Sequence, residues 1–104
     1  MEQLSFTSEG GHPETHDAVV VGVVASGNLE VMVEPMPGDA RCIVDISTPA
    51  RGFDDVWAAV MADFFDRWKL AGVRVSINDV GATPAVVSLR LDQAVEEFRK
   101  GAAP

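Results

Sequence analysis

Hydrophobic positions in much of the chain alternate with polar ones or form short continuous runs, and both patterns are typical of β-strands. A Val-rich run over residues 17–25 predicts a strand that is buried on both faces or nearly so. Alternation over residues 29–34, 41–48 and 73–78 predicts three more strands, each with one wetter face. We expect the first two strands to form a hairpin, because the connection between them is very short.

Two segments change to the spacing of three and four residues that is typical of helices. The first covers about residues 53–70, and its apolar stripe comprises Trp57, Val60, Met61, Phe64, Phe65 and Trp68. The second starts with Thr83 as N-cap and Pro84 as first helical residue. Its apolar stripe comprises Val87, Leu91, Ala94, Val95 and Phe98. The order β-β-β-α-β-α predicts an α+β fold, a two-layer sandwich with a four-stranded sheet and both helices packed on one face.

Polar residues and breakers are frequent before the first Val-rich run, so we expect residues 1–16 to form a flexible N-terminal lead-in. A chain of 104 residues is the length of a single domain, and its 47% hydrophobic content predicts a folded state rather than disorder. The start of the chain lacks the basic region and long apolar run of a signal peptide. No stretch approaches the roughly 20 apolar residues of a membrane span.

Charge and cysteine content narrow the classes of function. Lys and Arg total 8 against 16 Asp and Glu, so the net charge is −8. This balance argues against nucleic acid and anionic membranes as partners, and fits docking on basic protein surfaces. The single Cys42, expected in the core, permits no internal disulfide, and a cytoplasmic location is the simplest interpretation. No metal site is expected, because Pro13 disrupts the His12 and His16 spacing.

Ser26 is the residue with the clearest candidate chemistry. It precedes Gly27-Asn28, a two-residue turn signal whose members both tolerate the positive φ of tight hairpins. The turn places a hydroxyl at or beside an exposed hairpin tip, where another protein can modify it. A nucleophilic serine needs a nearby base. Eight strand residues put His16 roughly 26 Å away, so a self-contained hydrolase is not expected.

A second candidate segment is the start of the predicted second helix. The sequence Asp79-Val80-Gly81-Ala82-Thr83-Pro84 is explained structurally as a strand end, a turn and a helix N-cap. Backbone N–H groups at a helix start also bind phosphate. Gly81 and Thr83 are therefore weaker candidates for contacts with a phosphate-containing group.

Three segments carry a resemblance to a known family. The segment Ala25-Ser26-Gly27-Asn28-Leu29-Glu30-Val31, followed by residues 79–84 and by Leu89-Arg90-Leu91-Asp92-Gln93-Ala94, resembles the acyl carrier (delta) subunit of bacterial malonate decarboxylase. That family is distantly similar to the gamma chain of citrate lyase. The family's serine motif reads Gly-Ser-Gly-Asp-Leu-Glu. Here Ala25 and Asn28 replace the first Gly and the Asp, and both replacements keep the turn chemistry.

The resemblance implies a non-catalytic, single acyl-carrier domain over residues 1–104. Ser26, presented by Gly27 and Asn28, would bear 2'-(5''-phosphoribosyl)-3'-dephospho-coenzyme A through a phosphodiester. The thiol of this arm would carry acetyl and then malonyl. The implied partners are acyltransferase and decarboxylase subunits and the prosthetic-group transferase. Tethering would supply a high effective concentration at each active site.

Two other classes of protein are alternatives to this carrier. An ordinary acyl carrier protein with a 4'-phosphopantetheine arm is disfavoured, because its Asp-Ser-Leu motif at a helix start does not occur here. The alternative to a carrier is a non-covalent interaction or regulatory module of the small α+β type without a prosthetic group. Replacement of Ser26 by Ala separates the two hypotheses, because it disables a carrier and leaves a module nearly unaffected.

Overall fold

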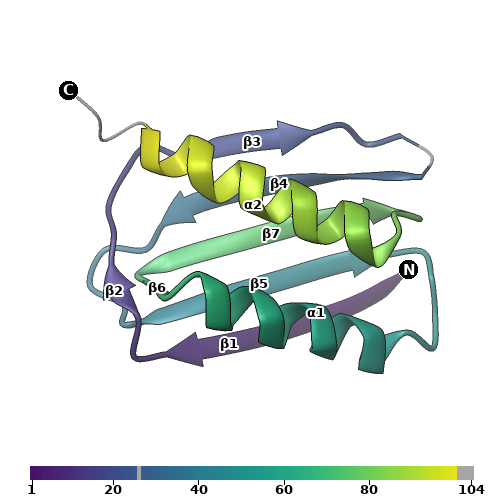
Figure 1. Cartoon of the computed structure of the whole chain (residues 1–104), viewed down its shortest axis with the longest axis horizontal. Helices are drawn as coiled ribbons and strands as arrows, with labels where there is room; N and C mark the ends of the chain where they lie inside the picture. Colours follow the sequence, from purple (N-terminus) through teal and green to yellow (C-terminus); the bar gives the residue numbers. More distant parts are fainter. Residues whose placement is uncertain (26, 101–104) are drawn as a thin grey trace.

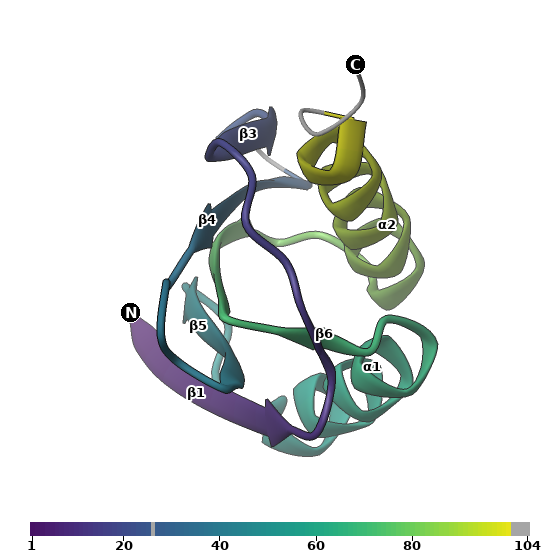
Figure 2. The ribbon, with the colours of Figure 1, turned by 90° about the vertical axis from the view of Figure 1, so that its left-hand side faces the viewer.

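A computed structural model describes residues 1–25 and 27–100. Its main sheet is mixed, with strand order β1-β5-β7-β4-β3, and only β5 and β7 pair in parallel (Figure 1). The strands are β1 (Glu2–Glu9), β3 (Val19–Gly22), β4 (Asn28–Pro35), β5 (Arg41–Thr48) and β7 (Val73–Val80). The helices are α1 (Asp54–Arg67) and α2 (Pro84–Lys100). Both helices cover the same face of the sheet (Figure 2), which confirms the α+β class and the two layers.

The sheet has one strand more than the four predicted, because part of the expected N-terminal lead-in is β1. This strand pairs antiparallel with β5 along its whole length, from Glu2 opposite Thr48 to Glu9 opposite Arg41. A further short strand, β2 (His12–Pro13), pairs in parallel with β6 (Leu70–Ala71). Only two residues of β1, Leu4 and Phe6, pack against the core. The hydrophobic pattern of this segment is therefore weak, and backbone pairing with β5 makes it a strand.

The Val-rich run is also placed differently from the prediction. Instead of a strand buried on both faces over residues 17–25, the structure has β3, four residues long, at the edge of the sheet. Val19 and Val21 pack against the core, whereas 56% of Val20 is exposed. β3 does pair antiparallel with β4, as the expected hairpin requires.

The hydrophobic core lies between the sheet and the two helices. Cys42 belongs to it with 1% exposure, as expected, and burial raises the pKa of its thiol to about 11. All five residues of the predicted α2 stripe are buried. The α1 stripe also faces the core, although Val60, Phe65 and Trp68 are only partly buried, and α1 ends at Arg67 rather than near residue 70. Neither helix in the described part of the chain is long and apolar enough to cross a membrane.

Candidate functional site

The turn between β3 and β4 contains Ser26, which lies outside the described residues, so the site is defined by its neighbours. The Asn28 N–H donates to the Ala25 carbonyl at 2.9 Å and closes the turn. Gly27 has a φ of +75°, the left-handed conformation that favours glycine. Asn28 closes this turn as the first residue of β4, but it does not have the positive φ that the turn signal predicted for both residues. Ala25 and Gly27 are both exposed.

This turn lies directly beside the connection from β7 to α2. The Gly27 N–H donates to the Val80 carbonyl at 2.7 Å, and Asn28 pairs with both Val80 and Gly81. The sequence did not show that these two candidate segments meet. They meet because β4 and β7 are neighbours in the sheet, and the end of β7 coincides with the beginning of β4.

Contacts within the chain already satisfy some of the backbone N–H groups at the start of α2. The Val86 N–H donates to Thr83 Oγ1 at 3.3 Å, which confirms Thr83 as N-cap. The Ala82 N–H donates to Asp79 Oδ1, and Pro84 has no N–H to offer. Gly81 is exposed, with open space where a side chain would stand. Of the two weaker candidates, Gly81 therefore lies next to the turn, and the Thr83 hydroxyl already has a structural role.

Arg90 is a site residue that the sequence reasoning missed. From α2, its Nη2 donates to Asn28 Oδ1 at 3.1 Å, and its Nη1 donates to Gln93 Oε1 at 2.7 Å. Its side chain also passes close to Gly22, where an added Cβ would lie 3.1 Å from the Arg90 Cδ. Arg90 thus places a positive charge beside Asn28, two residues from Ser26, in a chain of net charge −8. In the sequence, Arg90 lies in the segment 89–94 that contributes to the family resemblance and borders the apolar stripe of α2, but neither feature indicated a contact with the turn.

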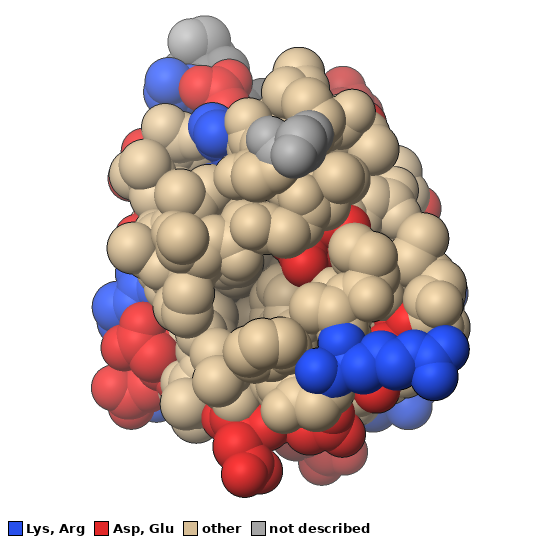
Figure 3. All heavy atoms as spheres, turned by 90° about the vertical axis from the view of Figure 1, so that its right-hand side faces the viewer, with Lys and Arg blue, Asp and Glu red and all other residues tan. Residues whose placement is uncertain are grey.

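An apolar groove opens at the same end of the molecule, between the starts of α1 and α2. It has a volume of about 260 Å³, and Figure 3 shows it as a hollow bordered mainly by side chains that are neither acidic nor basic. The one ionisable side chain that lines the groove is that of Asp79. It is 5% exposed and accepts a hydrogen bond from Thr48 Oγ1 at 2.8 Å. The groove is lined by Ala50, Phe53, Val56, Trp57, Val60, Asp79, Gly81, Ala82, Pro84 and Val87.

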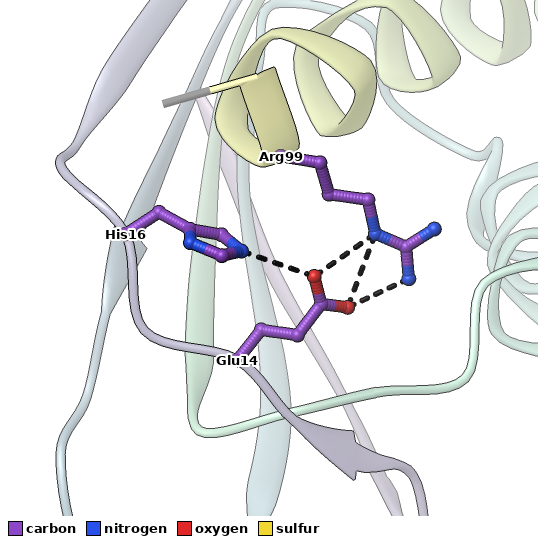
Figure 4. A network of polar contacts seen from close by, with 3 residues as sticks. All are labelled: Glu14, His16 and Arg99. Carbon is purple, nitrogen blue, oxygen red and sulfur yellow. Dashed lines mark hydrogen bonds and ion pairs between the residues drawn. The ribbon is translucent and has the colours of Figure 1, made fainter. Parts of the chain in front are cut away.

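His16 lies at the opposite end of α2 from the turn. Its ring contacts the Phe98 ring, with 4.7 Å between centroids, and its Nε2 lies 3.2 Å from Glu14 Oε1 (Figure 4). α2 has 17 residues, and at 1.5 Å per residue it is about 25 Å long. His12 is in β2, at the same end as His16 (Figure 1). Neither histidine is placed to act as a base near the turn.

Glu14 in this cluster also pairs with Arg99 Nη2 at 2.6 Å. Partial burial raises the pKa of Glu14, but hydrogen bonds from Arg99 and His16 outweigh it and bring the pKa below the ordinary 4.5. The cluster therefore holds residues 14–16 against the last turn of α2. Within residues 1–25 and 27–100, no group of three or more His, Cys, Asp or Glu side chains is arranged to hold a metal ion.

Comparisons with known proteins place the chain in a family. The family model for the malonate decarboxylase delta subunit (MdcD) matches residues 16–98. A malonate decarboxylase acyl carrier protein of Burkholderia cepacia is 60% identical over 93% of this chain and 90% of its own length. One from Stenotrophomonas maltophilia R551-3 is 54% identical over the full length of both chains.

A solved structure agrees with these matches. A chain in the crystal structure of a Pseudomonas malonate decarboxylase hetero-tetramer in complex with malonate is similar with a TM-score of 0.85 and 37% identity. The match covers 94% of this chain and 99% of that chain. The resemblance seen in the serine motif therefore extends over the whole fold, and the chain belongs to the malonate decarboxylase delta subunit family, whose members are named acyl carrier proteins.

Proposed function

We propose that this chain is the acyl carrier subunit of a malonate decarboxylase complex, and that Ser26 is the attachment point of phosphoribosyl-dephospho-coenzyme A. The observation that carries the proposal is the position of the serine-containing turn. It lies at the tip of the β3–β4 hairpin, between exposed neighbours, and is joined to the sheet through the Gly27–Val80 hydrogen bond. A modifying enzyme can approach such a tip without unfolding the carrier.

The residues around the turn suit a phosphodiester. Arg90 is held beside Asn28, and its buried Nε has no hydrogen-bond partner among the described residues. The positive charge of this guanidinium next to the turn favours a phosphate group there. The start of α2 adds the positive end of a helix dipole at the same place. These two features offset the negative charge of the chain where a phosphate would be attached.

The chain acts by presentation rather than by bond chemistry. When attached, the prosthetic group supplies a thiol that carries the acyl unit as a thioester. The Gly27–Val80 and Arg90–Asn28 hydrogen bonds hold the residues that follow Ser26 against the sheet and α2, so the arm would leave the protein beside the start of α2. We assign acyl transfer and decarboxylation to acyltransferase and decarboxylase partners, and the position of both histidines at the far end of α2 from the turn is consistent with this assignment. A tethered substrate meets their active sites at a high effective concentration.

The test is the intact mass of the protein purified from its native host during growth on malonate, followed by peptide mapping. We expect a mass increase equal to phosphoribosyl-dephospho-coenzyme A on the Ser26 peptide, with or without an acetyl group. A mass increase of phosphopantetheine size would support the carrier function but would show that the prosthetic group differs from the one proposed. An unmodified chain would overturn the proposal and favour the non-covalent interaction module.

A further inference from the structure

The apolar groove between α1 and α2 has no part in the attachment of a group to Ser26. We propose that it binds the adenine ring of the attached group, so that the chain holds the first part of its own arm and leaves the thiol end free. This inference rests on the proposed function, because it concerns the same prosthetic group.

The position of the groove selects the part of the arm that can enter it. Gly81 lines the groove and is bridged to Asn28, two residues from Ser26. Neighbouring strands lie about 5 Å apart, so the groove begins close to the attachment turn. The adenosine unit follows directly after the phosphoribosyl unit that is bonded to the serine, whereas the thiol lies at the far end of the arm. The part nearest the turn is therefore the part that the groove can hold.

The lining of the groove suits a flat aromatic ring. Trp57 is 6% exposed and forms part of the wall, and Phe53 stands at the groove with 51% of its surface exposed. Val56, Val87 and Pro84 complete an apolar surface. Nucleic acid bases stack on such aromatic side chains without sequence preference. A volume of about 260 Å³ lies below the usual 300–1,000 Å³ of pockets for drug-sized ligands, so it suits one ring system and not the whole arm.

The single ionisable side chain in the groove favours adenine over the acyl end. Asp79 accepts hydrogen bonds from Thr48 Oγ1 and the Ala82 N–H, and a carboxylate has capacity for further donors. The exocyclic amino group of adenine is such a donor. The carboxylate of a malonyl group is an acceptor of like charge and would be repelled. The groove therefore excludes the substrate and accepts the base.

The inference is tested by NMR on the full-length chain with and without the attached group, each form identified by its intact mass. We expect nuclear Overhauser contacts from the adenine C–H protons to the Trp57 ring and to the methyl groups of Val56 and Val87. We also expect the signals of these residues to shift between the two forms. Trp68, at the other end of α1, serves as an internal reference that should not shift.

Two matched variants extend the test. Val56→Glu places a charged side chain at an apolar groove residue that is 41% exposed, and we expect the adenine contacts to be lost. Leu89→Glu makes the same kind of change at an α2 residue that is 55% exposed and does not line the groove, and we expect the contacts to remain. Because both positions are exposed, each variant should fold. If a variant does not fold, the NMR contacts in the unsubstituted protein still test the inference.

The possible outcomes separate the inference from the proposed function. A loaded chain whose groove signals match those of the unloaded chain overturns the inference and leaves the carrier function intact. Contacts from the pantetheine methyl groups instead of adenine also overturn it. Failure to find any group on Ser26 in protein from the native host overturns the proposed function, and this inference with it.

Discussion

At the end of the molecule where α2 finishes, ion pairs join segments that are far apart in the sequence. Glu14 pairs with Arg99, Arg67 pairs with Asp92, and the Trp68 Nε1–H also donates to Asp92. At the end where α2 begins, the contacts are of another kind. Backbone hydrogen bonds hold the β3–β4 turn, and an apolar groove lies between the starts of the two helices (Figure 3).

This difference contrasts stabilising contacts at one end with open space at the other. Contacts at the charged end join residues 14–16 and the end of α1 to α2. At the end that contains the β3–β4 turn, the Arg90 guanidinium and the apolar groove lie beside the turn. Under the proposed function, this end supplies the positive charge and the space that a phosphate-containing group requires. Four predictions test this comparison.

The largest effect is expected for Ser26→Ala, because it removes the proposed point of attachment. We expect no mass increase after incubation with the attaching enzymes, and no malonate decarboxylation by a complex that contains the variant. The free energy of unfolding should change by no more than an exposed substitution usually causes, about 0.5 kcal/mol. Ser8→Ala, in β1, is the control and should load normally. A loaded Ser26→Ala chain would place the attachment at another residue.

The next effect is expected at Asp79, a buried acidic residue near the end of β7. Asp79→Ala removes the acceptor for both Thr48 Oγ1 and the Ala82 N–H. We expect a loss of about 2–3 kcal/mol in the free energy of unfolding, because buried donors are left without partners. Asp79→Asn keeps an acceptor for the Ala82 N–H and should lose less than half as much. Denaturant unfolding measures both, and equal losses would show that charge rather than hydrogen bonding matters here.

A smaller effect compares two turn glycines at opposite ends of the molecule. Gly27 and Gly38 have φ values of +75° and +85°, and a Cβ added at either position would have no atom within 4 Å. Each change to Ala should therefore cost about 1 kcal/mol of stability from backbone strain alone. We expect only Gly27→Ala to slow attachment of the prosthetic group, measured by mass spectrometry over time. Equal loading rates would mean that the attaching enzyme does not depend on the shape of this turn.

The smallest effect concerns acid stability at the charged end. The pKa of Glu14 is below its ordinary 4.5 in the folded protein, so its contribution to stability is present above pH 4.5 and is lost as the pH falls through the folded-state pKa. Glu14→Gln should cost up to about 1 kcal/mol at neutral pH. It should also flatten the fall in melting temperature below pH 4.5. Glu96→Gln, at an exposed position of α2, is the control and should keep the slope of the unsubstituted protein.

Local sequence patterns predicted the elements that carry their own signal. The α2 start at Pro84, its five buried stripe residues and the bounds of β5 all agree with the prediction. In each case the information lies in residues close together, such as a cap, a proline or an alternation. The two strands of the main sheet that were missed or misplaced, β1 and β3, are its two edges. Their structure depends on a partner strand and on which face a helix covers, and neither is encoded in a short segment.

The candidate site divides in the same way. The sequence by itself determined the serine motif, the turn chemistry of Gly27 and the capping role of Thr83, because these follow from the residues and their immediate neighbours. Only the tertiary structure decided that Gly81 lies against Asn28, that Arg90 reaches the turn from α2, and that a groove opens beside it. The physical reason is the strand order. The pairing of β4 with β7 joins two segments some fifty residues apart, and such long-range pairing is set by packing of the whole sheet rather than by local preference.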